Sequence, residues 1–89
     1  MEIKVGSIVI SSAGHDQGRA MVVVGADGGF VLLADGKERK LSSPKKKNIK
    51  HVRRTLGTIE LEGLTDKKLR QTLRTYYQAF ANNTLQESE

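Results

Sequence analysis

The sequence has no cysteine, no tryptophan, one proline, and only two phenylalanines and two tyrosines among its 89 residues. Without cysteine the chain forms neither disulfides nor thiolate metal sites, and secreted domains of this size usually depend on such cross-links. We therefore expect a cytoplasmic protein. The N-terminal segment has an acidic second residue and no long apolar run, so we expect neither a signal peptide nor a membrane span.

The core must be built mainly from valine, isoleucine and leucine, which occur in short runs separated by glycine-rich turns. Runs of this kind favour β-strands. In the first run Ile8 and Ile10 share a face, and the turns after it include Asp27-Gly28-Gly29 and Asp35-Gly36. Short strands with close turns predict a mostly β fold, a small and strongly bent β-barrel. Further strands are expected over 19–26, 30–34, 37–41, 47–52 and 58–62.

The hydrophobic period changes after residue 64, where an amphipathic helix is predicted. Thr65 can cap its N-terminus, Asp66 favours the positive end of the helix dipole, and Leu64 with Leu69 fits a hydrophobic staple. We expect the helix to end near residue 83 and its apolar stripe to close an open end of the barrel. The predicted units are therefore 1–64 as the barrel, 65–83 as the helix and 84–89 as a flexible tail. The apolar stripe comprises Leu69, Leu73, Tyr76 and Phe80, and a different face carries Lys67, Arg70 and Arg74.

Positive charge is concentrated in one segment. Residues 37–54 hold nine lysines and arginines against one acid, a net +8 within a chain of total charge +5, which leaves −3 for the rest. A localised cationic segment on an otherwise slightly acidic protein is typical of a surface that binds a polyanion.

The first two thirds of the chain resemble a known family. The matching blocks are "VGSIV", "AGHDQGR" with Gly14 and Gly18, "AMVVV", "FVLLADG" and "KKKNIKH", in this order and over about residues 5 to 55. They resemble the KOW domain, specifically the KOW-bearing large-subunit ribosomal proteins of archaea and eukaryotes and their small bacterial relatives. The resemblance implies an SH3-like barrel that binds RNA, commonly on the ribosome, without catalytic activity or a cofactor. It does not cover the helix.

The basic segment has three interpretations. One is a nuclear-import signal, which its lysines resemble, although that motif is short and frequent by chance. Lysines often protect the edge of a sheet from aggregation, and a solvated edge strand would explain them without a ligand. With the family resemblance, phosphate contact is favoured, because lysine and arginine neutralise phosphates and release counterions. We expect Ile49 and Val52 to anchor this segment in the core. The expected RNA-binding residues are Arg19, Lys37, Arg39, Lys40, Lys45, Lys46, Lys47, Lys50, Arg53 and Arg54.

The remaining polar features have simple structural explanations. Gly14 and Gly18 are expected at positive φ in a structural loop, which would also let RNA backbone approach. His15 and His51 are expected at the surface, because the sequence supplies no cysteine, paired acids or ligand spacing for a metal or a catalytic site. The aromatic residues do not indicate a stacking platform for bases, because two lie on the helix stripe and Phe30 lies inside a strand.

The sequence therefore predicts a non-enzymatic protein that binds RNA, with ribosomal RNA and also ribosomal proteins as expected partners, and with neither a membrane nor a small-molecule substrate. The alternative is a protein-interaction module that docks a transcription or translation factor. If the first hypothesis holds, reversing the charges of Lys45, Lys46 and Lys47 should weaken RNA binding without unfolding the domain.

Overall fold

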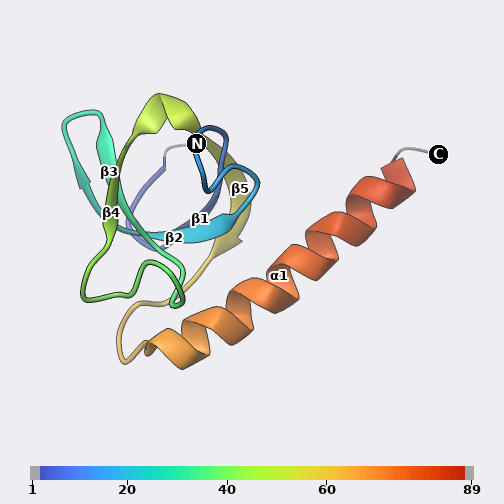
Figure 1. Cartoon of the computed structure of the whole chain (residues 1–89). Helices are drawn as coiled ribbons and strands as arrows, with labels where there is room; N and C mark the ends of the chain where they lie inside the picture. The colour runs from blue at the N-terminus through green and yellow to red at the C-terminus, as the bar shows by residue number, and fades with distance from the viewer. Residues whose placement is uncertain (1–2, 88–89) are drawn as a thin grey trace.

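The chain forms one antiparallel β-sheet followed by one helix. In the computed structural model (Figure 1), the backbone is described for residues 3–87 and the side chains up to residue 76. The helix α1 spans Asp66–Glu87, and a short 3₁₀ turn, η1, spans Ile49–His51. The strands are β1 (Ser7–Ser11), β2 (Ala20–Asp27), β3 (Phe30–Ala34), β4 (Lys45–Asn48) and β5 (Val52–Thr58).

The sheet has the order β4-β3-β2-β1-β5, and every neighbouring pair is antiparallel. Register shifts occur in β1 between Ser7 and Val9 and in β2 between Val23 and Gly25. Shifts of this kind bend and twist a strand, and the sheet curls into the barrel-like shape seen in Figure 1. The predicted mostly β fold with a C-terminal helix is confirmed, although hydrogen bonds do not close the sheet between β4 and β5.

The inner, concave face of the sheet holds the first core. Successive side chains of a strand point to opposite faces, and the inward set meets in one buried cluster inside the barrel. It consists of Val9, Met21, Val23, Val31, Leu33 and Val52, with Ile3 packed against it.

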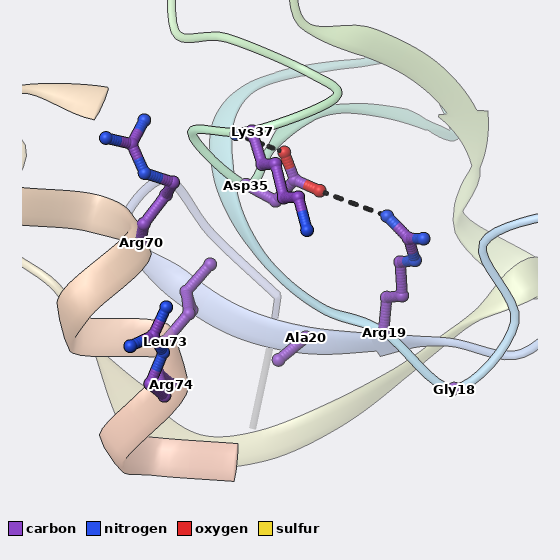
Figure 2. Close-up of a pocket in the computed structure, with 8 residues that line it drawn as sticks. All are labelled: Gly18, Arg19, Ala20, Asp35, Lys37, Arg70, Leu73 and Arg74. Carbon is purple, nitrogen blue, oxygen red and sulfur yellow. Dashed lines mark hydrogen bonds and ion pairs between the residues drawn. The ribbon is translucent and has the colours of Figure 1, made fainter. Parts of the chain in front are cut away.

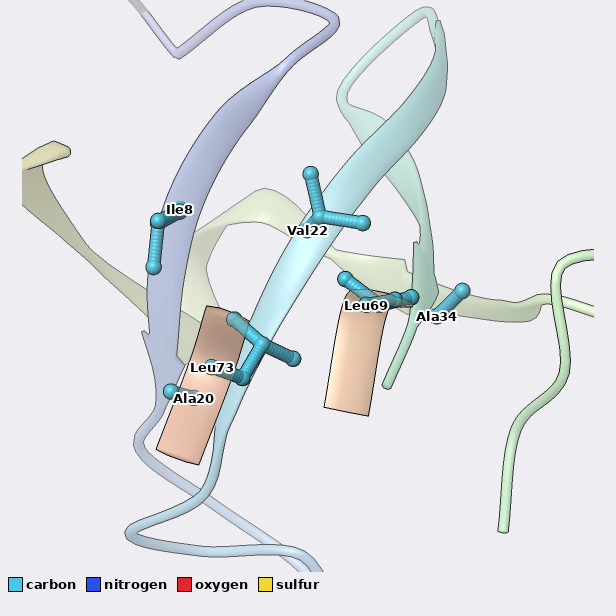
Figure 3. Packing of buried hydrophobic residues seen from close by; sticks show 6 residues of the cluster. All are labelled: Ile8, Ala20, Val22, Ala34, Leu69 and Leu73. Atoms are coloured by element: carbon cyan, nitrogen blue, oxygen red, sulfur yellow. The ribbon is translucent and has the colours of Figure 1, made fainter. Parts of the chain in front are cut away.

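The outer face of the same strands holds a second core, which α1 covers. Leu69 and Leu73 of the helix are buried against Ile8, Ala20, Val22 and Ala34 (Figure 3). Burying two leucine side chains stabilises the docked helix by roughly 3 to 6 kcal/mol. The helix thus lies on the outer face of the sheet, and the expectation that it closes an end of the barrel is wrong. Ile8 and Ile10 share this face, as predicted.

The start of α1 confirms the predicted cap. The Thr65 hydroxyl accepts a hydrogen bond from the Lys68 amide at 3.2 Å. The Asp66 carboxylate accepts one from the Leu41 amide at 2.8 Å, which ties the helix to the loop between β3 and β4. Farther along, Tyr76 lies directly over Gly57. The side chain of Phe80, predicted on the same stripe, lies outside the described part.

Four elements differ from the expectation. The expected strand over 47–52 is interrupted by η1, so that its two ends belong to β4 and β5. Residues 37–41 form no strand, because the Asp35 carboxylate accepts hydrogen bonds from the Lys37 and Arg39 amides and folds the segment into a turn. Strand β5 ends at Thr58, so the expected strand over 58–62 is absent. The helix continues to Glu87, four residues beyond the expected end, and residues 88–89 lie outside the described part.

Within residues 3–87 no helix is long and apolar enough to cross a bilayer.

Candidate nucleic-acid interface

The loop between β1 and β2, residues 12–19, is the centre of the candidate site. Its ends are joined by hydrogen bonds from the Gly18 amide to the Ser11 carbonyl (2.8 Å) and from the Ser11 amide to the Arg19 carbonyl (3.0 Å). Gly18 has φ of +90°, and a side chain added there would meet no atom within 4 Å. The prediction of positive φ at Gly14 and Gly18 is confirmed. The backbone at Gly18 is therefore open to a ligand.

A buried ion pair fixes this loop to β4. The Lys47 ammonium donates to Asp16 Oδ1 and to the Ala13 carbonyl, each at 2.7 Å, and Ser11 Oγ donates to Asp16 Oδ1 at 2.8 Å. Asp16 and Lys47 are 8% and 7% exposed. Burial by itself raises the pKa of Asp16, but the hydrogen bonds from Lys47 and Ser11 and the charges of Lys47 and Lys45 outweigh it, so that pKa lies well below its usual value.

Lys47 is consequently not a phosphate contact. Its side chain points to the inner face of β4, because its strand partner is the buried Val31, and its charge is satisfied by Asp16. This burial predicts that charge reversal across Lys45, Lys46 and Lys47 would destabilise the domain, contrary to the expectation from the sequence. A glutamate at position 47 would place a second carboxylate beside Asp16 in a buried site.

The neighbouring residue has the opposite orientation. Lys46 points outward, and its ammonium lies 4.7 Å from the centre of the Phe30 ring. Phe30 is 39% exposed despite its place in β3, which corrects the argument that a strand position hides this aromatic ring. Val52 is buried as predicted, whereas Ile49 is exposed on η1 and does not anchor the core.

Cations flank the β1–β2 loop on two sides of Gly18. On one side a depression runs from Gln17 and Gly18 to Arg53 and Arg54 of β5. On the other side Gly18 borders a cleft between the barrel and α1, shown in Figure 2. The cations of this cleft are Arg19, Lys37, Arg70 and Arg74.

A third group of charged residues lies beside Arg19. A small depression is lined by His15, Arg39 and Lys45 together with three acidic residues, which form ion pairs with Arg19 and Lys45. Arg19 forms ion pairs with Glu38 at 3.0 Å and with Asp35 at 3.8 Å. Lys45 lies 3.4 Å from Asp16. Arg19 and Lys45 are therefore partly engaged within the protein.

The predicted site residues thus divide into separate groups. The fold brings six of them around the β1–β2 loop, places Lys46 on the outer face of β4, buries Lys47, and leaves Lys40 and Lys50 exposed on the loop before β4 and on η1. Sequence reasoning left Arg70 and Arg74 out of the expected site. Their spacing of four residues places them on one helix face, but only the docking of α1 shows that this face borders the loop. The six are Arg19, Lys37, Arg39, Lys45, Arg53 and Arg54.

Among residues 3–87 no group of three histidine, aspartate or glutamate side chains is placed to hold a metal ion. No model of a protein family matches the chain, and a comparison with the curated proteins gives no match.

Proposed function

We propose that this protein binds structured RNA, and ribosomal RNA in particular, by holding backbone phosphates around the β1–β2 loop. The observation that carries the proposal is the set of cations that flanks this loop on several sides of the open backbone at Gly18. Lysine and arginine side chains neutralise phosphates at any sequence. The exposed glycine allows a sugar–phosphate chain to approach the loop without meeting a side chain.

The buried Asp16–Lys47 pair supports this proposal through its effect on geometry. It ties the β1–β2 loop to β4 and so fixes the distance between cations on the two elements. Structured RNA is recognised largely by shape and by contacts to phosphates and 2′-hydroxyls. A rigid arrangement of cations suits such a ligand. The resemblance to KOW domains points in the same direction.

Sedimentation of cell lysate through a density gradient tests the proposal. We expect the protein to migrate with the large ribosomal subunit and to return to the free fraction after RNase treatment or at raised salt. Migration as a free protein at low salt would contradict the ribosomal assignment.

Direct binding to an RNA hairpin tests the interface itself. Arg39 and Arg53 are exposed cations whose side chains have no partner in the described part of the chain. Replacing both with alanine should weaken binding and lower the slope of log affinity against log salt concentration by about 1.4 to 1.8, because each phosphate contact contributes about 0.7 to 0.9 to that slope. Lys68→Ala is the control, since Lys68 lies away from the loop beside Glu60 and Glu62. Equal affinity of the double variant and the wild type would refute the interface.

A second candidate function is the docking of another protein, such as a transcription or translation factor. Leu56 on β5 is 84% exposed, and β5 is an edge strand of the sheet. An exposed edge strand with an apolar side chain can pair with a strand of a partner. Such a complex would sediment unchanged after RNase and would respond little to salt, whereas Leu56→Ser would disrupt it.

A further inference from the structure

The cleft between α1 and the barrel collects positive charge from three separate parts of the chain. Arg19 comes from the end of the β1–β2 loop, Lys37 from the turn after β3, and Arg70 and Arg74 from the helix. Figure 2 shows the helix residues on one side of the cleft and the barrel residues on the other, with Leu73 and Ala20 between them. The volume is about 390 Å³, within the range of sites for small ligands.

Asp35 is the one acidic residue that lines the cleft, against four cations, and its carboxylate already has partners within the protein. Asp35 Oδ1 accepts hydrogen bonds from two backbone amides at 2.8 and 2.9 Å, and Oδ2 lies 3.8 Å from the Arg19 guanidinium. Four cations so close repel one another. The net positive charge of the cleft lining is thus left for a ligand to neutralise.

The four cations have two different roles. Arg70 donates to the Gly36 carbonyl at 2.6 Å, and Arg19 is paired with Glu38, so both are held in position by the protein. Lys37 and Arg74 are exposed, and their side chains have no partner among the residues that the structure describes. Two oriented guanidinium groups with two available cations suit an anion with several oxygens, because arginine binds phosphate through two parallel hydrogen bonds.

The opposite flank of the helix provides an internal comparison. There a depression is lined by Lys68 together with Glu60 and Glu62, so the single cation is outnumbered by acids. The helix is therefore flanked by a depression with more acids than cations on one side and by a cationic cleft on the other. Solvation of a generic charged helix does not account for this asymmetry.

We propose that the cleft between α1 and the barrel is a phosphate-binding site, and that α1 thereby forms part of the RNA interface. The second half of this inference rests on the proposed RNA-binding function, since it assigns the cleft to a phosphodiester of the RNA backbone. The helix then has two roles: its apolar stripe covers the outer face of the sheet, and its neighbouring cationic face contacts the ligand.

The test uses the full-length protein with two probes, tripolyphosphate and a labelled RNA hairpin. Tripolyphosphate should shift the backbone amide NMR signals of Lys37, Arg70 and Arg74, and the double variant Lys37→Ala/Arg74→Ala should abolish these shifts. For the hairpin, each single alanine variant should bind more weakly than the wild type and should lower the slope of log affinity against log salt concentration by about 0.7 to 0.9. Lys68→Ala should change affinity by less than twofold. Neither replaced side chain has a contact that the fold depends on, so the variants should remain folded.

The outcomes separate this inference from the proposed function. In one outcome, the hairpin binds and Arg39→Ala/Arg53→Ala weakens its binding, but the cleft variants bind like the wild type and tripolyphosphate shifts no cleft amide. The cleft proposal is then overturned and the RNA interface stands.

In the other outcome, tripolyphosphate shifts the cleft amides, but the hairpin does not bind with a dissociation constant below about 100 µM. The phosphate site is then supported and the RNA function is overturned.

Discussion

Replacing Asp16 with alanine should destabilise the protein far more than any exposed substitution. The change removes the carboxylate that accepts from Lys47 at 2.7 Å and leaves a buried ammonium with only the Ala13 carbonyl as a partner. Ser11 Oγ, which donates to the same carboxylate, keeps the same Ala13 carbonyl as an acceptor, at 3.1 Å. The penalty therefore arises mainly from the unpaired charge.

The size of the effect follows from distance and burial. Two unit charges 2.7 Å apart attract by about 6 kcal/mol at an effective dielectric constant of 20. Part of this gain is offset by desolvation, and removing one partner of a buried pair costs about 3 to 5 kcal/mol. The whole domain is expected to have a stability of about 4 to 13 kcal/mol. At about 4 to 8 °C per kcal/mol, Asp16→Ala should lower Tm by at least about 12 °C.

Thermal and urea unfolding followed by circular dichroism measure this loss, and a double-mutant cycle assigns it to the pair. Asp16→Ala/Lys47→Met removes both charges and should be more stable than Asp16→Ala alone, because no buried charge is left without its partner. Lys46→Met on the same strand is the control and should cost about 1 kcal/mol or less, the size of its contact with Phe30. A loss below 1 kcal/mol for Asp16→Ala, or no recovery in the double variant, would refute the reasoning.

Two further predictions concern acid stability and helix docking. The pKa of Asp16 is lowered in the folded state, so its contribution to stability is complete above the unfolded carboxyl pKa of about 3.9 and is lost as pH falls through the folded-state value. The free energy of unfolding should therefore decline below about pH 5. Urea unfolding at a series of pH values should show a shallower decline for Asp16→Asn than for the wild type. Gly57→Ala should cost about 1 to 3 kcal/mol, because the added Cβ would lie 2.6 Å from Tyr76 Cε1. The near-ultraviolet tyrosine signal should change with it, and an unchanged signal and stability would contradict the described docking of α1.

Local patterns were sufficient to predict much of the fold. Thr65 caps α1 because its hydroxyl accepts a hydrogen bond from an amide of the first helical turn, which has no partner within the helix. Such a cap depends only on residues that are close in the sequence. The glycine turns at 27–29 and 35–36 also have local causes. The prediction of a strand over 37–41 is wrong for a local reason that the alternation of polar and apolar residues does not reveal. The Asp35 carboxylate accepts hydrogen bonds from the amides two and four residues later.

The candidate site was harder to predict because its geometry depends on distant contacts. Three consecutive lysines suggest one solvated surface, yet β4 turns Lys47 inward and Lys46 outward. The partner of Lys47 is Asp16, 31 residues earlier, and nothing near position 47 indicates it. Arg74 joins Lys37 in one cleft only because Leu69 and Leu73 dock the helix on the sheet.

The two-sided sheet also has a consequence during synthesis. A ribosome makes the strands before the helix, so the growing chain can form the inner core while Ile8, Val22 and Ala34 on the outer face still lack their cover. Until Leu69 and Leu73 are added, the nascent chain exposes an apolar surface of the kind that chaperones bind and that promotes aggregation. A product terminated before residue 69 should accordingly be insoluble or rapidly degraded, even though it contains every strand of the barrel.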